Sequence, residues 1–277
     1  MKPYRIPELA NKFIAYDMIH RFTGLPAFTE ARTRLLYVAL TGEPTSPPQH
    51  NELYVLVVGL LQLGLDTHDW IDTQRETGSE MEMRERQLRV LGGDYFSGRF
   101  YHLLAHAGQI QVIRKLSEAV CEINRLKMDQ YAAMQQERLD SDGYIACGVA
   151  QRSQLLLSFT EMISRELRPC WEELVESVSR AELLAGELDR LHDPAGFHWS
   201  LGYWLLREYG MVDAGAAEPG VRAAVHDRIA GELQLAVADL RKLADTRAPM
   251  MAEVLRRIGE DLLAAEASPA PAFNETR

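Results

Sequence analysis

The stretch LYVLVVGLLQLGLDTHDWID, residues 53–72, decides the fold of this chain. Its first 13 residues carry no charge, and three aspartates follow within the next seven. An uncharged run of this length is shorter than the ~18 residues that a membrane-spanning helix needs. A helix that is apolar all round is buried on several sides. The stretch therefore predicts a buried helix, from about Asn51 to about Arg75, with an acidic end.

A second informative stretch, RQLRVLGGDYFSGRFYHLLA, covers residues 86–105. Ser79 and Glu82, just before it, fit the S-x-x-E capping box and predict a helix that runs to about Ala107. The Gly92-Gly93 step permits another helix to approach closely, with Asp94 bonding across the gap.

Aromatic residues follow at Tyr95, Phe96, Phe100 and Tyr101. Such residues most often belong to the core, but these four cover a broader arc than one helix face. A helix that is apolar over so wide an arc is buried on more than one side. We therefore expect the four aromatic side chains to lie at a subunit interface.

The rest of the chain also favours helices, with proline and glycine clustered between the helical blocks. No region shows the alternation of a strand. The sequence predicts an all-α fold, a bundle of about ten helices. We expect a single domain over residues 1–265 and a disordered tail over residues 266–277.

Composition narrows the possible functions. The chain has 277 residues, of which 30 are basic and 40 acidic, a net charge of −10. This balance argues against binding to nucleic acid or to an anionic membrane surface. The N-terminus lacks the apolar core of a signal peptide, and no transmembrane segment is expected. Cys121, Cys147 and Cys170 match no zinc motif and are expected to be buried, reduced thiols of a cytoplasmic protein.

The aspartates Asp66, Asp69 and Asp72 are spaced by three residues, so a helix places them along one stripe. Carboxylate oxygens suit Mg²⁺, which keeps several waters and bridges to substrate phosphates. The alternative is a solvated helix end whose aspartates pair with Arg75 or Arg84. His68 stands between the acids and is expected to hydrogen-bond, since imidazole favours a softer metal than Mg²⁺.

The order of these pieces resembles the trans-isoprenyl diphosphate synthase superfamily, and the resemblance implies an isoprenoid-synthase-like helical bundle. In combination, LGLDTHDW, RQLRVLGGDYFSGRFYHLLA and EAVCEINRLKM resemble component 1 of heptaprenyl diphosphate synthase. The specific similarity covers residues 53–128. It implies a non-catalytic subunit that works with a catalytic component 2. Together the two would extend farnesyl diphosphate with isopentenyl diphosphate, using Mg²⁺ held mainly by the partner, to make the menaquinone side chain.

The same resemblance implies roles for individual residues. Asp66, Asp69 and Asp72 stand where a diphosphate and magnesium site would be, with His68 and Asp94 beside it as supporting residues. The helix that carries Tyr95, Phe96, Phe100 and Tyr101 would pack across the axis between subunits.

The sequence departs from the catalytic members of the superfamily, which carry D-D-x-x-D twice. Asp66-Thr-His-Asp69 lacks the adjacent pair, and no D-D-x-x-D occurs further along. Half of a diphosphate clamp predicts little or no activity for the chain alone. Two alternatives stay open: a stand-alone class I terpene synthase that uses Asp66, Asp69 and Asp72, and a purely structural interaction protein. A neighbouring gene for a chain with two such motifs would favour the auxiliary subunit.

Overall fold

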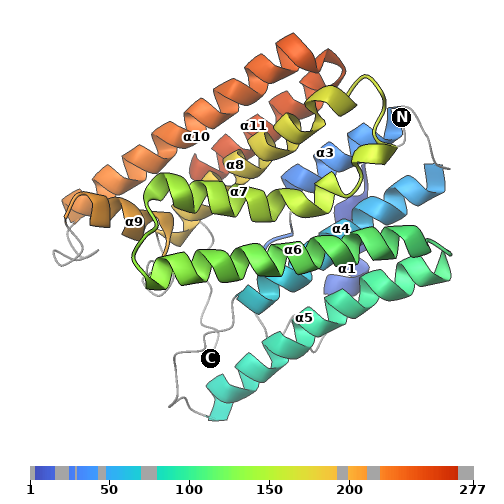
Figure 1. Ribbon diagram of the computed structural model, residues 1–277, viewed down its shortest axis with the longest axis horizontal. Coiled ribbons are helices and arrows are strands. Elements are labelled where there is room, and N and C mark those ends of the chain that lie inside the picture. Colours follow the sequence, from blue (N-terminus) through green and yellow to red (C-terminus); the bar gives the residue numbers. More distant parts are fainter. Residues whose placement is uncertain are drawn as a thin grey trace. The chain divides into compact units, whose positions relative to one another are not determined.

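The computed structural model describes residues 4–15, 25–28, 30–42, 48–69, 80–191, 199–210 and 219–267. These residues form ten α-helices, three short 3₁₀ turns and no strand (Figure 1), which confirms the predicted all-α fold. They group into two compact units, each described by itself below. The N-terminal unit comprises Met1–Ala119 and Ser158–Arg165, and the C-terminal unit comprises Val120–Leu157 and Glu166–Arg277. The single domain expected over residues 1–265 stays a prediction.

The N-terminal unit is built around the predicted apolar helix. Its helices are α1 (Ile6–Ile14), α3 (Glu30–Thr41), α4 (Pro48–Asp69), α5 (Glu80–His106) and the first part of α6 (Ile110–Gln135). α1, α3 and α5 all pack against α4. From Tyr54 to Leu65 every residue of α4 is buried. This enclosure accounts for the uncharged run of residues 53–65, because a helix segment that is apolar all round packs on several sides.

The C-terminal unit has α8 (Trp171–Arg190) as its central helix. α7 (Ser141–Leu157), α10 (Pro219–Arg247) and α11 (Ala252–Ala267) pack against α8, while α9 (Leu201–Glu208) packs on α7 and α10 (Figure 1). Two fully buried tryptophans, Trp171 and Trp204, are the largest side chains of this core. α11 extends to Ala267, and the rest of the expected tail lies outside the described residues.

Helix boundaries follow local chemistry. Asp140 immediately precedes α7: its carboxylate accepts a hydrogen bond from the Gly143 amide at 2.7 Å, which satisfies an N–H that has no partner within the helix. α7 ends at Leu157. Beyond that point the chain leaves the helix, and Phe159 becomes fully buried against Tyr54, with ring centroids 5.8 Å apart.

The cysteines agree with expectation only in part. All three are free thiols, and Cys170 is buried as predicted. Burial raises the pKa of the Cys170 thiol, which keeps it protonated and inert. Cys121 is exposed on α6, so the prediction of burial is wrong there: it faces outward, between the buried positions Leu116 and Ile123. In the described part of the chain, no helix is both long and apolar enough to cross a membrane.

Candidate functional site at the acidic end of α4

The predicted acidic stripe emerges where α4 leaves the core. Asp66 is half-buried and Asp69 is exposed at the last residue of the helix. Thr67, between them, is buried and donates its hydroxyl hydrogen to the Leu63 carbonyl at 2.6 Å. Asp72, the third predicted member, lies outside the described residues, as do Arg75 and Ser79. Two of the three carboxylates can therefore be placed.

Asp66 is tied to the core by a buried relay. The Arg32 guanidinium on α3 donates to Oε1 of Gln62 at 3.0 Å, and Nε2 of Gln62 donates to the Asp66 carboxylate at 2.7 Å. Arg32 is 4% exposed, so its charge is taken out of water. A buried cation needs an acceptor nearby, and Gln62 provides one. The hydrogen bond from Arg32 polarises the Gln62 amide and so strengthens the bond that the amide donates to Asp66. The relay fixes the orientation of this carboxylate.

His68 lies where α4 meets α5. Its Nε2 atom is 3.5 Å from Oδ1 of Asp94. A Cβ atom on Gly93 would come within 2.5 Å of His68 Nε2, so only glycine leaves room for this ring. On α4, a Cβ at Gly64 would lie 3.1 Å from the Gly93 carbonyl oxygen. The Gly92-Gly93 step therefore lets α4 and α5 approach closely, as the sequence predicts, and Asp94 reaches across the gap to His68.

The four aromatic residues of α5 divide into two classes. Phe96 is fully buried in a core cluster with Ala10, Leu56, Leu60 and Leu63, and Phe100 is 2% exposed. Tyr101 is 47% exposed, and Tyr95 is partly buried. Gly98, on the same helix, has open space where a side chain would lie. Packing inside the chain therefore accounts for the two phenylalanines, and Tyr101 is the aromatic residue left at the surface.

The structure describes only part of the donor set that the sequence predicts at this end of α4. Within the described ranges, no three His, Cys, Asp or Glu side chains gather closely enough to hold a metal ion. Asp66 and Asp69 offer the hard oxygen atoms that Mg²⁺ prefers, and Gln62 engages one oxygen of Asp66, Oδ1. Because Asp72 lies outside the described residues, the metal site stays a prediction.

Sequence reasoning found the acids but missed the residues that hold them. Arg32 and Gln62 are 30 residues apart and lie in unrelated sequence contexts. The one available signal was Gln62, the single side-chain amide within the uncharged run of residues 53–65, because a buried amide needs hydrogen-bond partners.

Comparison with known proteins identifies the family of the chain. The sequence model of the family heptaprenyl diphosphate synthase (HEPPP synthase) subunit 1 matches residues 16–192. Heptaprenyl diphosphate synthase component 1 of Geobacillus stearothermophilus is 34% identical over 138 residues. That match covers 50% of this chain and 57% of the relative, so it spans little more than half of the relative's length.

Solved structures of prenyl synthases share the fold. A geranylgeranyl pyrophosphate synthase from Lactobacillus brevis has a TM-score of 0.68 at 13% identity, covering 94% of this chain and 95% of that one. A polyprenyl synthase from Caulobacter crescentus, complexed with calcium and isoprenyl diphosphate, has a TM-score of 0.64 at 14% identity, with coverages of 96% and 94%. At these identities the likeness establishes the isoprenyl diphosphate synthase fold and nothing finer.

Proposed function

Since the chain belongs to the family of heptaprenyl diphosphate synthase subunit 1, we propose that it is the non-catalytic subunit of a two-component polyprenyl diphosphate synthase. Its partner would be the catalytic component 2, which would hold the prenyl diphosphates and most of the Mg²⁺. The complex would extend farnesyl diphosphate with isopentenyl diphosphate for the side chain of menaquinone. The observation that supports this role is in the sequence: Asp66-Thr-His-Asp69 lacks the adjacent aspartate pair that the catalytic members of the superfamily carry, and no D-D-x-x-D motif occurs further along.

The proposed division of labour follows from electrostatics. Ionisation of an allylic diphosphate requires the departing diphosphate to be clamped by several positive centres. At the acidic end of α4, the sequence Asp66-Thr-His-Asp69 supplies at most half of such a clamp. Chemistry would then take place on the partner, and this chain would support the partner's active conformation.

Reconstitution tests the proposal directly. The purified chain, Mg²⁺, farnesyl diphosphate and labelled isopentenyl diphosphate should give no more long prenyl product than a blank without protein. Adding the product of the partner gene should restore elongation. Turnover by the chain alone would contradict the proposal and favour the stand-alone terpene synthase. A partner that is fully active without the chain would also contradict it.

Substitution of the two placed aspartates gives a second prediction. Asp66→Ala and Asp69→Ala should each reduce the activity of the complex by less than the roughly 10²-fold that loss of a transition-state clamp costs. Asp66→Asn, which keeps an oxygen acceptor for Gln62, serves as the matched control for loss of the relay. If either alanine variant abolished activity while the complex stayed assembled, the acidic cluster would be a working metal site.

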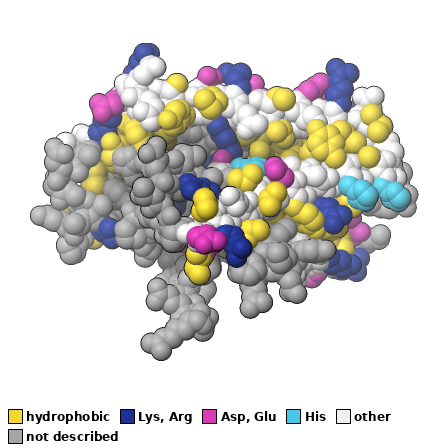
Figure 2. Space-filling model, turned by 90° about the horizontal axis from the view of Figure 1, so that it is seen from below, with side chains coloured by type: hydrophobic (Ala, Val, Ile, Leu, Met, Phe, Trp, Pro, Cys, Tyr) yellow, Lys and Arg dark blue, Asp and Glu magenta, His cyan; other side chains and the backbone are white. Residues whose placement is uncertain are grey.

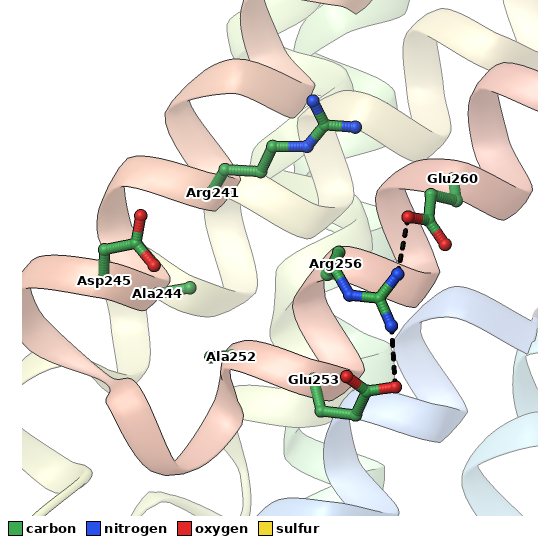
Figure 3. A pocket seen from close by; sticks show the side chains of 7 residues that line it. All are labelled: Arg241, Ala244, Asp245, Ala252, Glu253, Arg256 and Glu260. Atoms are coloured by element: carbon green, nitrogen blue, oxygen red, sulfur yellow. Dashed lines mark hydrogen bonds and ion pairs between the residues drawn. The ribbon is translucent and has the colours of Figure 1, made fainter.

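We propose that the partner binds α5, the helix that the sequence predicts at the interface. The contact would be made by an outer stripe of this helix. The stripe consists of exposed positions three or four residues apart: Leu91, Asp94, Gly98, Tyr101 and Ala105. Leu91 is 61% exposed and Tyr101 is 47% exposed. Figure 2 shows hydrophobic side chains distributed over this face of the molecule. Phe96 and Phe100 would support the stripe from the core side.

Charge at the outer stripe should weaken assembly. Tyr101→Glu and Leu91→Glu should each lower affinity for the partner by about tenfold or more, because central aromatic and aliphatic anchors dominate interface energetics. Leu235→Glu on α10, where the parent leucine is 67% exposed, is the matched control and should bind as the unmodified chain does. The measurement is co-purification followed by titration with the partner. Equal binding by all three variants would remove α5 from the interface.

A further inference from the structure

Two histidines lie one helical turn apart near the C-terminal end of α5. His102 and His106 are spaced i, i+4, so they project from the same face of the helix. Their rings are stacked, with centroids 6.3 Å apart and planes inclined by 11°, and both residues are exposed. Figure 2 shows histidine side chains gathered at one edge of the face that carries α5.

The surroundings of the pair leave it accessible. Gly98, four residues before His102, has open space in place of a side chain. Arg99 is directed elsewhere: its guanidinium lies over the rings of Tyr95 and Phe13, at 4.8 and 5.6 Å from their centroids. His106 is the last residue of α5, where the negative end of the helix dipole favours a cation.

We propose that His102 and His106 form a two-histidine site for a divalent transition-metal ion of the Zn²⁺ or Ni²⁺ class. Imidazole nitrogens suit these ions, and histidines at i and i+4 on one helix are a recurrent pair of zinc ligands. Mg²⁺ is a poor competitor, because it demands oxygen ligands. Within the described residues no third protein ligand joins the pair, so water completes the coordination shell and the site stays open and exchangeable.

The histidine pair differs from the acidic end of α4 in the kind of metal ion that it suits. The acidic end of α4 offers oxygen atoms to a hard cation, whereas the histidine pair offers nitrogen atoms to a softer one. Because imidazole binds a metal only as the neutral base, occupancy should fall as the solution is acidified. The inference does not depend on the identity of the partner subunit, and the isolated chain suffices to test it.

Calorimetric titration of the full chain with ZnCl₂, without any affinity tag, tests the site. The background should carry Cys121→Ser, because the exposed thiol is a competing zinc ligand. We expect one Zn²⁺ per chain, unaffected by excess Mg²⁺. His102→Ala and His106→Ala should each weaken binding by at least the roughly 10–100-fold that loss of even a supporting partner of a metal ligand costs.

His226→Ala is the matched control, since His226 is exposed on α10 beside Asp227 and has no histidine four residues away. Its zinc binding should equal that of the background. A second readout, the ring proton signals of the histidines in NMR spectra, should show two residues shifting together on addition of Zn²⁺. The proposal is overturned if the background binds no zinc, or if the α5 variants bind as tightly as His226→Ala.

Discussion

Replacing Phe96 with alanine is expected to lower the free energy of unfolding by about 3–5 kcal/mol, the usual cost of truncating a buried aromatic side chain. Phe96 is fully buried and packs against Ala10, Leu56, Leu60 and Leu63 in the N-terminal unit. Its removal leaves a cavity on α5, and neighbouring helices relax only partly to fill it. Phe96→Asp adds an unpaired buried charge and should prevent the N-terminal unit from folding.

Urea unfolding followed by circular dichroism measures the effect. Tyr101→Ala is the control on the same helix: its side chain is about half exposed, and its hydroxyl bonds to Ser117 Oγ at 2.9 Å at the surface. It should cost less than ~1 kcal/mol, as most surface substitutions do. A loss below ~1 kcal/mol for Phe96→Ala would contradict the burial of this side chain. Equal losses for both variants would contradict the division of the aromatics into two classes.

The difference between the buried Phe96 and the exposed Tyr101 shows which features of α5 are predictable from its sequence. The helix itself was predicted because its capping box and long periodic pattern are local signals. Which aromatic residues face the core was not predictable, since Tyr95, Phe96, Phe100 and Tyr101 cover too wide an arc to define one face. The answer depends on how α1 and α4 pack around α5, and that packing depends on residues distant in sequence. The predicted interface therefore moves from the phenylalanines to the outer stripe of α5.

The candidate site was predictable to a similar degree. The acidic stripe on α4 follows from residue spacing alone, and the Gly-Gly-Asp step correctly indicated a close helix contact. Asp72 and the helix end predicted near Arg75 lie outside the described residues. The relay from Arg32 could not be predicted, because it joins two helices whose sequences carry no shared motif. The relay nevertheless orients the Asp66 carboxylate through the hydrogen bond from Gln62.

A second large effect is expected at Glu187, in the C-terminal unit. Glu187 lies in the last turn of α8, and its carboxylate is 2% exposed. It accepts hydrogen bonds from the Tyr144 hydroxyl at 2.8 Å, from Arg190 at 3.1 Å and from the Leu201 amide at 2.8 Å. One side chain thereby joins α7, α8 and the start of α9.

Glu187→Ala should lower the free energy of unfolding by about 2–6 kcal/mol, because two buried groups lose their acceptor, whereas the ion pair with the exposed Arg190 contributes little. The substitution leaves the Tyr144 hydroxyl and the Leu201 amide buried without their acceptor, and each such group costs roughly 1–3 kcal/mol. Glu187→Gln keeps one oxygen acceptor and should cost less than the alanine variant. Urea unfolding of both variants measures the difference, and an alanine variant as stable as the glutamine variant would contradict the role of the carboxylate.

The same cluster predicts a loss of stability in alkali. Burial, together with the negative charge of Glu187, raises the pKa of the Tyr144 phenol well above its ordinary value. An unfolded tyrosine loses its proton near pH ~10, whereas the folded Tyr144 keeps it. Above pH ~10 the unfolded state therefore binds fewer protons than the folded state, so stability falls as the pH rises, by about 1.4 kcal/mol per pH unit for one such group.

Tyr144→Phe should make this alkaline decline shallower by the contribution of one tyrosine. Part of the slope should persist, because burial raises the pKa of Tyr4 in the N-terminal unit to about 12. Tyr131→Phe on α6 is the matched control, since Tyr131 is 56% exposed and its replacement should leave the slope unchanged. The measurement is urea unfolding at several pH values between neutrality and strong alkali. An identical slope for Tyr144→Phe and Tyr131→Phe would mean that the phenol beside Glu187 does not keep its proton through folding.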